Sequence, residues 1–236
     1  DQKHDVWNYK PAEYRQNKLG IGLKNLGSTC YMNSLFQVFN RIPTFLNEIF
    51  ASSDANLQSF QWVLASLQKS NRDFIDPSRF INEWKGWKGQ TINPKVEQNV
   101  TEFYYYIIQS CPENARNLFT GEQTIKYIGD NGFEKEVSEP FFSLSVKIKG
   151  FSNLVQSIYS MIEPEIVNNF DNEKGDKIIV TKSMKITKCP KILVVQINRF
   201  ESDQQNNQKF EFPEHLNISP LLQEEGINTD EMNAII

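Results

Sequence analysis

Histidine and cysteine are the scarce reactive residues of this 236-residue sequence. It contains two histidines and three cysteines, and the cysteines (Cys30, Cys111 and Cys189) are odd in number and far apart. Scattered cysteines of this kind do not form the paired framework of a disulfide-stabilised secreted domain. The sequence therefore indicates a reducing, intracellular compartment, which we expect to be the cytoplasm or the nucleus.

Long apolar runs and an excess of basic residues are also lacking. No uninterrupted apolar stretch approaches the roughly 20 residues that a membrane-spanning helix requires, and the polar, charged N-terminus has no signal-peptide pattern. The formal net charge is −4, which argues against a general nucleic-acid-binding protein. We therefore expect neither a membrane nor a nucleic acid as a partner.

The sequence does contain a distinctive segment around its first cysteine, where residues 22–34 read GLKNLGSTCYMNS. Ser28 and Thr29 are candidate N-cap residues for a helix that begins there. Apolar residues follow Cys30 at helical spacing: Met32, Leu35, Phe36 and Phe39. A thiol at the start of a helix lies at the positive end of the helix dipole, which favours the attacking thiolate.

The same segment offers hydrogen-bond donors for an oxyanion. Backbone N–H groups at the start of the helix and the side-chain amide of Asn25 are suited to that task. The alternative for Cys30 is a small apolar residue buried at the beginning of a core helix.

The segment closely resembles the cysteine box of the ubiquitin-specific proteases, a family of papain-like deubiquitinating enzymes. That box reads Gly-Leu-x-Asn-x-Gly-x-Thr-Cys-Tyr-Met-Asn-Ser, and this sequence meets every fixed position. The resemblance implies that Cys30 is the nucleophile and that Asn25, with the Cys30 N–H, forms the oxyanion hole. It implies hydrolysis of the peptide or isopeptide bond after the C-terminal glycine of ubiquitin, with ubiquitin and ubiquitinated proteins as partners.

A second segment, residues 97–103 (EQNVTEF), resembles the Gln-Gln-Asp-Ala-x-Glu-Phe box of the same family. The resemblance implies that Gln98, Asn99 and Glu102 bind the ubiquitin tail. Asn99 stands where the family has an aspartate, and an amide has one acceptor oxygen and no charge, so we expect weaker tail binding. The alternative for Glu102 is a solvated charge on a helix.

Two further segments resemble the family in the family's order. Residues 189–200 (CPKILVVQINRF) are similar to its Leu-Pro-x-x-Leu-x-x-x-Leu-x-Arg-Phe strand, and residues 209–219 contain the Phe-Pro pair of the next segment. The Gly-His-Tyr motif that supplies the family's base is absent. His4 and His215 are the two histidines, and the alternatives for His215 are a substitute base or an exposed structural residue.

We therefore expect a truncated catalytic domain that is inactive by itself for want of the catalytic histidine. The alternative function is a catalytically incomplete ubiquitin-binding module, or a scaffold segment of a large protein. Many family members hold zinc with two Cys-x-x-Cys pairs, but residues 118–142 and 165–185 contain neither cysteine nor histidine. Tetrahedral zinc cannot be built from what remains, so we expect no metal and no cofactor.

The distribution of patterns predicts an α+β protein. Helical patterns follow Cys30 and recur over 57–67, 74–87, 100–108 and 154–162, while strand patterns occupy 141–148, 178–186, 192–197 and 210–212. The resemblance implies a papain-like fold with a helical thumb, zinc-free fingers and an incomplete β palm. We expect a lead-in segment at 1–20 and a catalytic domain at 21–236, with the thumb at about 21–112 and the fingers and part of the palm at about 113–236.

Overall fold

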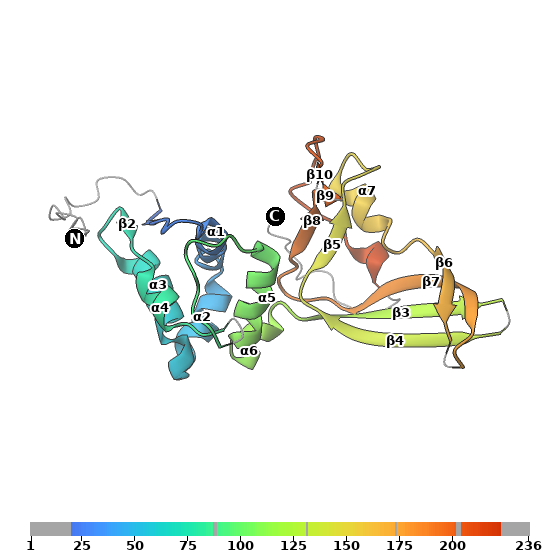
Figure 1. Cartoon of the computed structure of the whole chain (residues 1–236), viewed down its shortest axis with the longest axis horizontal. Coiled ribbons are helices and arrows are strands. Elements are labelled where there is room, and N and C mark those ends of the chain that lie inside the picture. Colours follow the sequence, from blue (N-terminus) through green and yellow to red (C-terminus); the bar gives the residue numbers. More distant parts are fainter. Residues whose placement is uncertain (1–19, 87–88, 131, 173, 202–203, 223–236) are drawn as a thin grey trace. The chain divides into compact units, whose positions relative to one another are not determined.

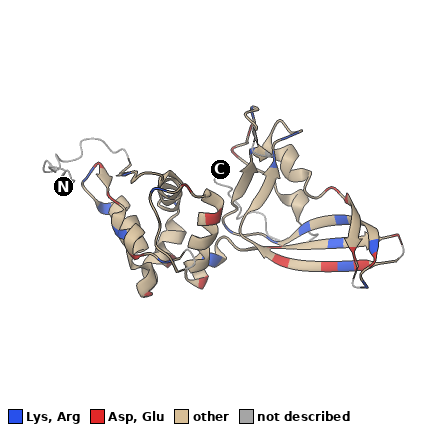
Figure 2. Ribbon diagram, in the orientation of Figure 1, with Lys and Arg blue, Asp and Glu red and all other residues tan. Residues whose placement is uncertain are grey.

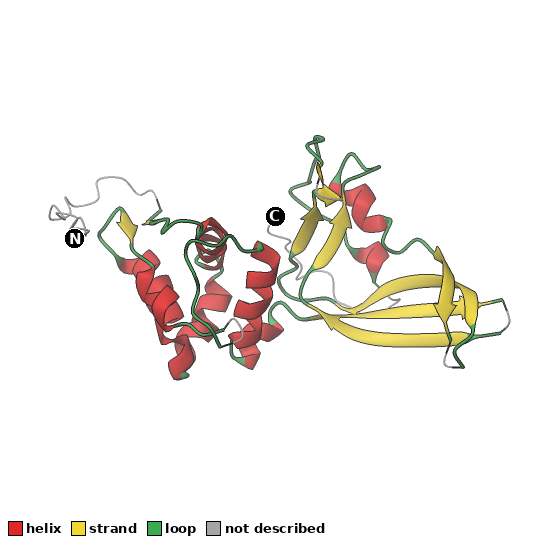
Figure 3. Ribbon diagram, in the orientation of Figure 1, coloured by secondary structure: helices red, strands yellow, loops and turns green. Residues whose placement is uncertain are grey.

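The structure, a computed structural model, describes residues 20–86, 89–130, 132–172, 174–201 and 204–222. The chain divides into two compact units, Asp1–Arg116 and Asn117–Ile236. The first unit is mainly helical, and the strands of the second form most of its structure (Figure 1 and Figure 3). The expected α+β class is confirmed, whereas all but the last residue of the expected lead-in lies outside the described residues.

The first unit is built from helices and one pair of very short strands. The strands β1 (Gly22–Leu23) and β2 (Phe74–Ile75) pair in parallel. The helices are α1 (Cys30–Phe39), α2 (Pro43–Ala51), the 3-10 turn η1 (Ala55–Leu57), α3 (Gln58–Lys69), α4 (Ser78–Glu83), α5 (Val100–Ser110) and α6 (Glu113–Asn117).

Aromatic side chains form the centre of this unit. The ring of Phe36 on α1 is fully buried and lies 5.3 Å from Phe60, 4.9 Å from Phe80 and 6.1 Å from Phe103, measured between ring centroids. These partners come from α3, α4 and α5, and burying each such side chain stabilises the fold by about 1.5–3 kcal/mol. One face of α1 is thereby fixed in the core, while Cys30 at its start stays exposed.

The predicted helices of this unit are confirmed with one correction. The helix after Cys30 and those within 57–67 and 100–108 are present, and all four predicted apolar residues of α5 are buried: Phe103, Tyr104, Ile107 and Ile108. The predicted helix over 74–87 was wrong at both ends. Phe74–Ile75 forms β2, and α4 begins only at Ser78 because the residue before Pro77 is biased away from helical geometry. It ends at Glu83, and Trp87 lies outside the described residues.

The second unit contains an antiparallel four-stranded sheet in the order β4-β3-β7-β6. Its strands are β3 (Gly121–Gly129), β4 (Glu134–Phe141), β6 (Glu165–Asp171) and β7 (Lys177–Lys188). The remaining elements are β5 (Leu144–Lys147), which pairs in parallel with β8 (Val195–Asn198), the hairpin of β9 (Phe200–Glu201) with β10 (Gln204–Gln205), the helix α7 (Leu154–Tyr159) and the 3-10 turn η2 (Ser219–Leu221).

This unit has its own hydrophobic core, centred on β5 and α7. Val146, Ile148 and Ile158 are fully buried there, together with Ile186 from β7. The hydroxyl of Ser157 donates to the carbonyl of Lys147 at 2.6 Å, which fixes α7 to the end of β5. Within the described residues, backbone pairing and apolar packing hold this unit together, and no group of three or more metal-ligating side chains is found.

The predictions for this unit were confirmed in part. The strand over 178–186 is present, and the helix predicted over 154–162 begins at Leu154 but ends at Tyr159. The pattern over 141–148 is interrupted, since β4 ends at Phe141 and β5 begins at Leu144. The predicted buried strand over 192–197 begins only at Val195 and is half-buried, because within the described residues β8 pairs on one side only, with β5.

The predicted strand over 210–212 was also wrong. Glu211 makes only an isolated bridge to Asn153, and the segment has no regular strand partner among the described residues. Phe210 is buried in the second core while Phe212 remains 51% exposed. The alternation of apolar residues therefore reflects one anchoring side chain rather than a sheet.

Candidate active site

Cys30 is the first residue of α1, and its side chain is exposed. The two other cysteines are different, because burial raises the pKa of the Cys111 thiol to about 12 and that of the Cys189 thiol to about 12. Thiolates are the reactive form of cysteine. Among the three, only Cys30 is exposed, and the alternative of a buried apolar residue does not describe it.

The side chain of Asn25 is held by its oxygen. Its Oδ1 accepts hydrogen bonds from the backbone N–H of Gly27 (3.1 Å), the backbone N–H of Thr29 (3.1 Å) and the hydroxyl of Thr29 (3.0 Å). Three donors to one oxygen fix which end of the amide is the carbonyl. The Nδ2 group has no partner among the described residues, so it remains as a donor next to the start of α1.

Thr29 occupies the predicted N-cap position of α1 but does not cap the helix with its side chain. Its hydroxyl instead accepts from the Leu26 N–H at 3.1 Å and donates to Asn25. The expected side-chain cap was therefore wrong, because the loop uses this hydroxyl for its own closure. Helix N-termini without a side-chain acceptor leave N–H groups for an external anion.

A close backbone contact ties this loop to the segment before α5. The N–H of Ser28 donates to the carbonyl of Pro94 at 2.6 Å. Gly27 has a φ of +138°, and a Cβ there would lie 2.6 Å from the same carbonyl oxygen. The glycine is thus required twice, by its backbone conformation and by the approach of Pro94.

The strand that leads into Asn25 is anchored to α1 from one side. Asn33 donates from Nδ2 to the carbonyls of Leu23 (3.4 Å) and Lys24 (3.2 Å), and Gln37 donates from Nε2 to the carbonyl of Ile21 (2.7 Å). Asn33 and Gln37 are four residues apart and share a helix face. Sequence reasoning missed both residues, although this spacing of two amides on a helix without charged residues was a usable signal.

The same strand is anchored from β2 by an ion pair. Lys24 Nζ lies 3.2 Å from Asp76 Oδ2. Burial disfavours the charge of Asp76, but the hydrogen bonds from Ser78 and the neighbouring Lys24 outweigh it and hold the pKa of the carboxyl below its usual value. The position of Asn25 is thus fixed by both α1 and β2.

The three predicted tail-binding residues lie at the start of α5, which packs against α1. The rings of Tyr31 and Phe103 meet edge to face at 5.1 Å, so the first turns of the two helices lie side by side. Gln98 is half-buried and Glu102 is exposed in the first turn of α5. The structure therefore brings the two sequence boxes together within one unit, as the close-lying α1 and α5 in Figure 1 show.

Asn99 is the N-cap of α5. Its Oδ1 accepts from the backbone N–H of Thr101 (2.8 Å) and of Glu102 (3.3 Å). The one acceptor oxygen of this amide is therefore already used by the helix. A carboxylate in its place would have a second oxygen for an incoming ligand.

Neither histidine is among the described residues of the helical unit. His4 lies outside the described residues, and His215 is exposed in the second unit, after the Phe212–Pro213 pair. Two alternatives were open for His215, a substitute base or an exposed structural residue. Its exposure accords with the second. None of the described residues bonds to it.

Charge is distributed unevenly along the chain. The helix α1 carries no charged residue, whereas β3 and β4 carry several of both signs (Figure 2).

Of the helices within the described ranges, none has the length and the apolar character that crossing a bilayer demands.

An exposed thiol at the first residue of a helix, next to a fixed side-chain amide, is the arrangement of a cysteine-type hydrolase. The sequence model of the family described as "Ubiquitin carboxyl-terminal hydrolase" matches residues 21–234. The chain belongs to this family, and its α+β structure is of the papain-like type.

Individual relatives agree. The chain is 25% identical over 286 residues to ubiquitin carboxyl-terminal hydrolase 9Y of Homo sapiens, covering 91% of this chain and 11% of that protein. It is 24% identical to ubiquitin carboxyl-terminal hydrolase 48 of Danio rerio (95% and 25% covered) and 27% identical to ubiquitin carboxyl-terminal hydrolase 7 of Caenorhabditis briggsae (87% and 20% covered). The chain thus spans a quarter or less of the length of these relatives.

Proposed function

We propose that this chain is the catalytic part of a thiol-dependent deubiquitinase that cleaves the peptide or isopeptide bond after the C-terminal glycine of ubiquitin. The observation that carries the proposal is the Asn25 side chain. Three hydrogen bonds hold its oxygen, two of them from Thr29, the residue before the exposed Cys30, and its Nδ2 is left as a donor. Family membership supplies ubiquitin and ubiquitinated proteins as the substrate class.

In the proposed mechanism, the Cys30 thiolate attacks the carbonyl carbon of the terminal glycine. The carbonyl oxygen becomes an oxyanion that accepts from Asn25 Nδ2 and from the Cys30 N–H. Collapse of this intermediate breaks the C–N bond, and the leaving amine takes up a proton. Water then hydrolyses the resulting thioester, which releases ubiquitin and restores the thiol.

The start of α5 is proposed to shape the channel for the ubiquitin tail. Gln98, Asn99 and Glu102 are its residues, and they belong to the helix that packs against the first turn of α1. We place the thumb at about 21–112 and the fingers and part of the palm at about 113–236.

The 236-residue chain by itself is proposed to be essentially inactive in turnover. A positioned base must return a proton to the leaving amine, and general acid–base catalysis contributes about 10²- to 10⁴-fold. The exposed His215 lies in the second unit and bonds to none of the described residues. The presence of free cysteines supports an intracellular, reducing compartment for the protein.

Two assays on the same chain test this proposal. With ubiquitin that carries a C-terminal electrophile, the chain forms a covalent adduct, which Cys30→Ala abolishes while ubiquitin binding survives; Cys189→Ala is the matched control and keeps the adduct. With a ubiquitin–aminocoumarin amide, the chain shows essentially no turnover, and His215→Ala does not change this. An adduct that persists in Cys30→Ala contradicts the nucleophile, and fast turnover that His215→Ala abolishes contradicts the missing base.

The alternative is a ubiquitin-binding module without catalysis. The same pair of assays separates the two functions, because a binding module retains ubiquitin but forms no adduct at Cys30.

A further inference from the structure

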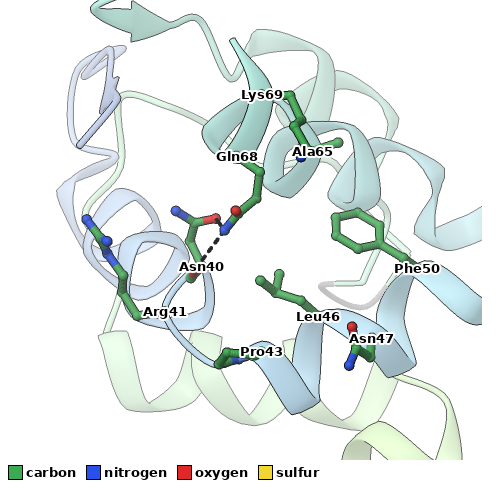
Figure 4. Close-up of a pocket in the computed structure, with 9 residues that line it drawn as sticks. All are labelled: Asn40, Arg41, Pro43, Leu46, Asn47, Phe50, Ala65, Gln68 and Lys69. Carbon is green, nitrogen blue, oxygen red and sulfur yellow. Dashed lines mark hydrogen bonds between the residues drawn. The ribbon is translucent and has the colours of Figure 1, made fainter. Parts of the chain in front are cut away.

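A hollow of about 620 Å³ lies on the surface of the helical unit, away from Cys30 along α1. It is formed by the end of α1, by α2 and by α3 (Figure 4). Most of its lining residues are exposed, and only Asn40 and Leu46 are buried. A hollow this open does not enclose a small molecule, which usually loses most of its surface on binding. It suits part of a larger chain.

The floor of the hollow is apolar. Leu46 and Phe50 on α2 lie across from Ala65 on α3 (Figure 4). Phe50 is 43% exposed, a large value for a phenylalanine on a helix whose other aromatic residue, Phe45, is fully buried. Exposed aromatic side chains in a concave surface are enriched where proteins bind one another.

The polar side chains that line the hollow carry many hydrogen-bond donors. Asn40 is only 9% exposed, and both its backbone carbonyl (3.0 Å) and its Oδ1 (2.7 Å) accept from Gln68 Nε2. This pair fixes the amide of Asn40 and leaves its Nδ2 without a partner among the described residues. That nitrogen is not sealed in the interior, so it can donate to an acceptor in the hollow.

Two cations border the same hollow, namely Arg41 after α1 and Lys69 at the end of α3. Neither forms an ion pair with any described residue, and no aspartate or glutamate is among the described lining residues. This local excess of positive charge contrasts with the net charge of −4 of the whole chain. Charge complementarity therefore selects an anionic partner.

We propose that this hollow, the α1–α2–α3 groove, is a docking site for an acidic peptide segment of another protein. An aliphatic or aromatic side chain of the segment packs on Leu46 and Phe50. Carboxylates of the segment pair with Arg41 and with Lys69, and a peptide carbonyl accepts from Asn40 Nδ2. The site is separate from Cys30, so it would recruit a partner rather than take part in the reaction.

The test uses fluorescein-labelled synthetic peptides and fluorescence polarisation with the complete 236-residue chain. The probe is an eight-residue peptide of glutamates flanking a Leu-Phe pair. One comparison peptide replaces the glutamates with lysines, and a second replaces Leu-Phe with Ala-Ala. The probe binds, both comparison peptides bind at least about ten-fold more weakly, and binding of the probe weakens as salt rises.

Two matched pairs of variants locate the binding. The double variant Arg41→Glu with Lys69→Glu lowers the affinity at least about ten-fold, while Lys185→Glu with Lys191→Glu makes the same change of net charge elsewhere and leaves it unchanged. Phe50→Ala weakens binding, and Phe74→Ala, which removes a similarly exposed phenylalanine (40%), does not. Circular dichroism verifies that each variant folds.

Three outcomes overturn the proposal. One is no binding of the probe, a second is equal binding of the lysine peptide, and a third is equal loss of affinity in the control variants. Ubiquitin-adduct formation at Cys30 is measured in parallel. The groove variants are expected to retain adduct formation at Cys30. Loss of peptide binding at the groove is therefore distinguishable from failure of the proposed catalytic function.

Discussion

At the scale of single residues, the two ends of the Asn25 amide have different tasks. The oxygen closes the loop before α1 through three hydrogen bonds, and the nitrogen is left as a donor. The sequence pattern indicated Asn25 and Cys30, but it did not show which atom of the amide is used by the fold. That distinction depends on the conformation of the loop, because Thr29 could equally have capped the helix.

The three thiols are predicted to react in a fixed order. In iodoacetamide at pH 7.5, Cys30 is alkylated first, because it is exposed, while Cys111 and Cys189 stay protonated with pKa values raised to about 12 by burial. Intact-protein and peptide mass spectrometry follow the reaction. In urea all three react alike, and faster alkylation of Cys189 than of Cys30 in the folded protein would contradict the assignment.

Asn99→Asp is predicted to strengthen the binding of ubiquitin. The carboxylate keeps one oxygen for the N–H groups of Thr101 and Glu102, gains a second oxygen for the tail, and adds a charge at a helix N-terminus. We expect about a two- to five-fold lower Kd, on the scale of the 0.3–1 kcal/mol typical of such charges.

Calorimetry of ubiquitin binding in a Cys30→Ala background measures this effect. The control is Asn114→Asp, another exposed asparagine, in α6 of the same unit. A weaker or unchanged affinity in Asn99→Asp means that Asn99 serves only the helix.

At the scale of elements, long amphipathic patterns predicted structure well and short ones did not. The helices at Cys30, 58–69 and 100–110 have apolar residues on one face, and burial of that face stabilises each helix in the fold. The segment at 74–76 is decided instead by a distant partner, because Phe74–Ile75 pairs with Gly22–Leu23. Pairing over that distance leaves no periodic signal in the sequence.

Asp76→Asn is predicted to destabilise the junction of β1 and β2. The variant keeps an acceptor for Ser78 but loses the charge that pairs with Lys24. Both partners are about one-third exposed, so the expected loss of unfolding free energy is about 0.2–1 kcal/mol.

This effect should depend on pH. The pKa of Asp76 is lowered in the folded protein, so its contribution is present above the unfolded value and is lost as the pH falls through the folded value. Thermal unfolding of both proteins between pH 7 and pH 3 measures it. The difference shrinks towards acid pH, and a difference that grows there would contradict the ion-pair account.

At the scale of the whole molecule, each unit has its own core in the described residues, rich in aromatic side chains in the first and mainly aliphatic in the second. The change from helical to strand patterns predicted this α+β organisation. The strands β3, β4 and β6 were not identified individually, because their faces mix charged and apolar residues, as Glu134–Phe141 does. Pairing with β7 fixes β3 and β6 instead, and pairing with β3 fixes β4.

The second unit is predicted to fold without metal. Its sequence at 118–142 and 165–185 has no cysteine or histidine, and its sheet is formed by backbone pairing. A chelator therefore leaves the thermal midpoint unchanged, and elemental analysis finds no stoichiometric zinc. A lowered midpoint that added zinc restores would contradict this prediction.

The central claim is that Cys30 and Asn25 Nδ2 together stabilise a tetrahedral adduct at the ubiquitin C-terminus. The most direct measurement compares the affinity of the chain for ubiquitin aldehyde, which forms such an adduct, with its affinity for ordinary ubiquitin. The account predicts that the aldehyde binds at least about 100-fold more tightly and that Cys30→Ala removes this preference. Asn25→Asp, which keeps the acceptor oxygen of the loop but removes the donor, reduces the preference by about 10²-fold while the protein stays folded. A preference for the aldehyde that either substitution leaves undiminished would contradict the account.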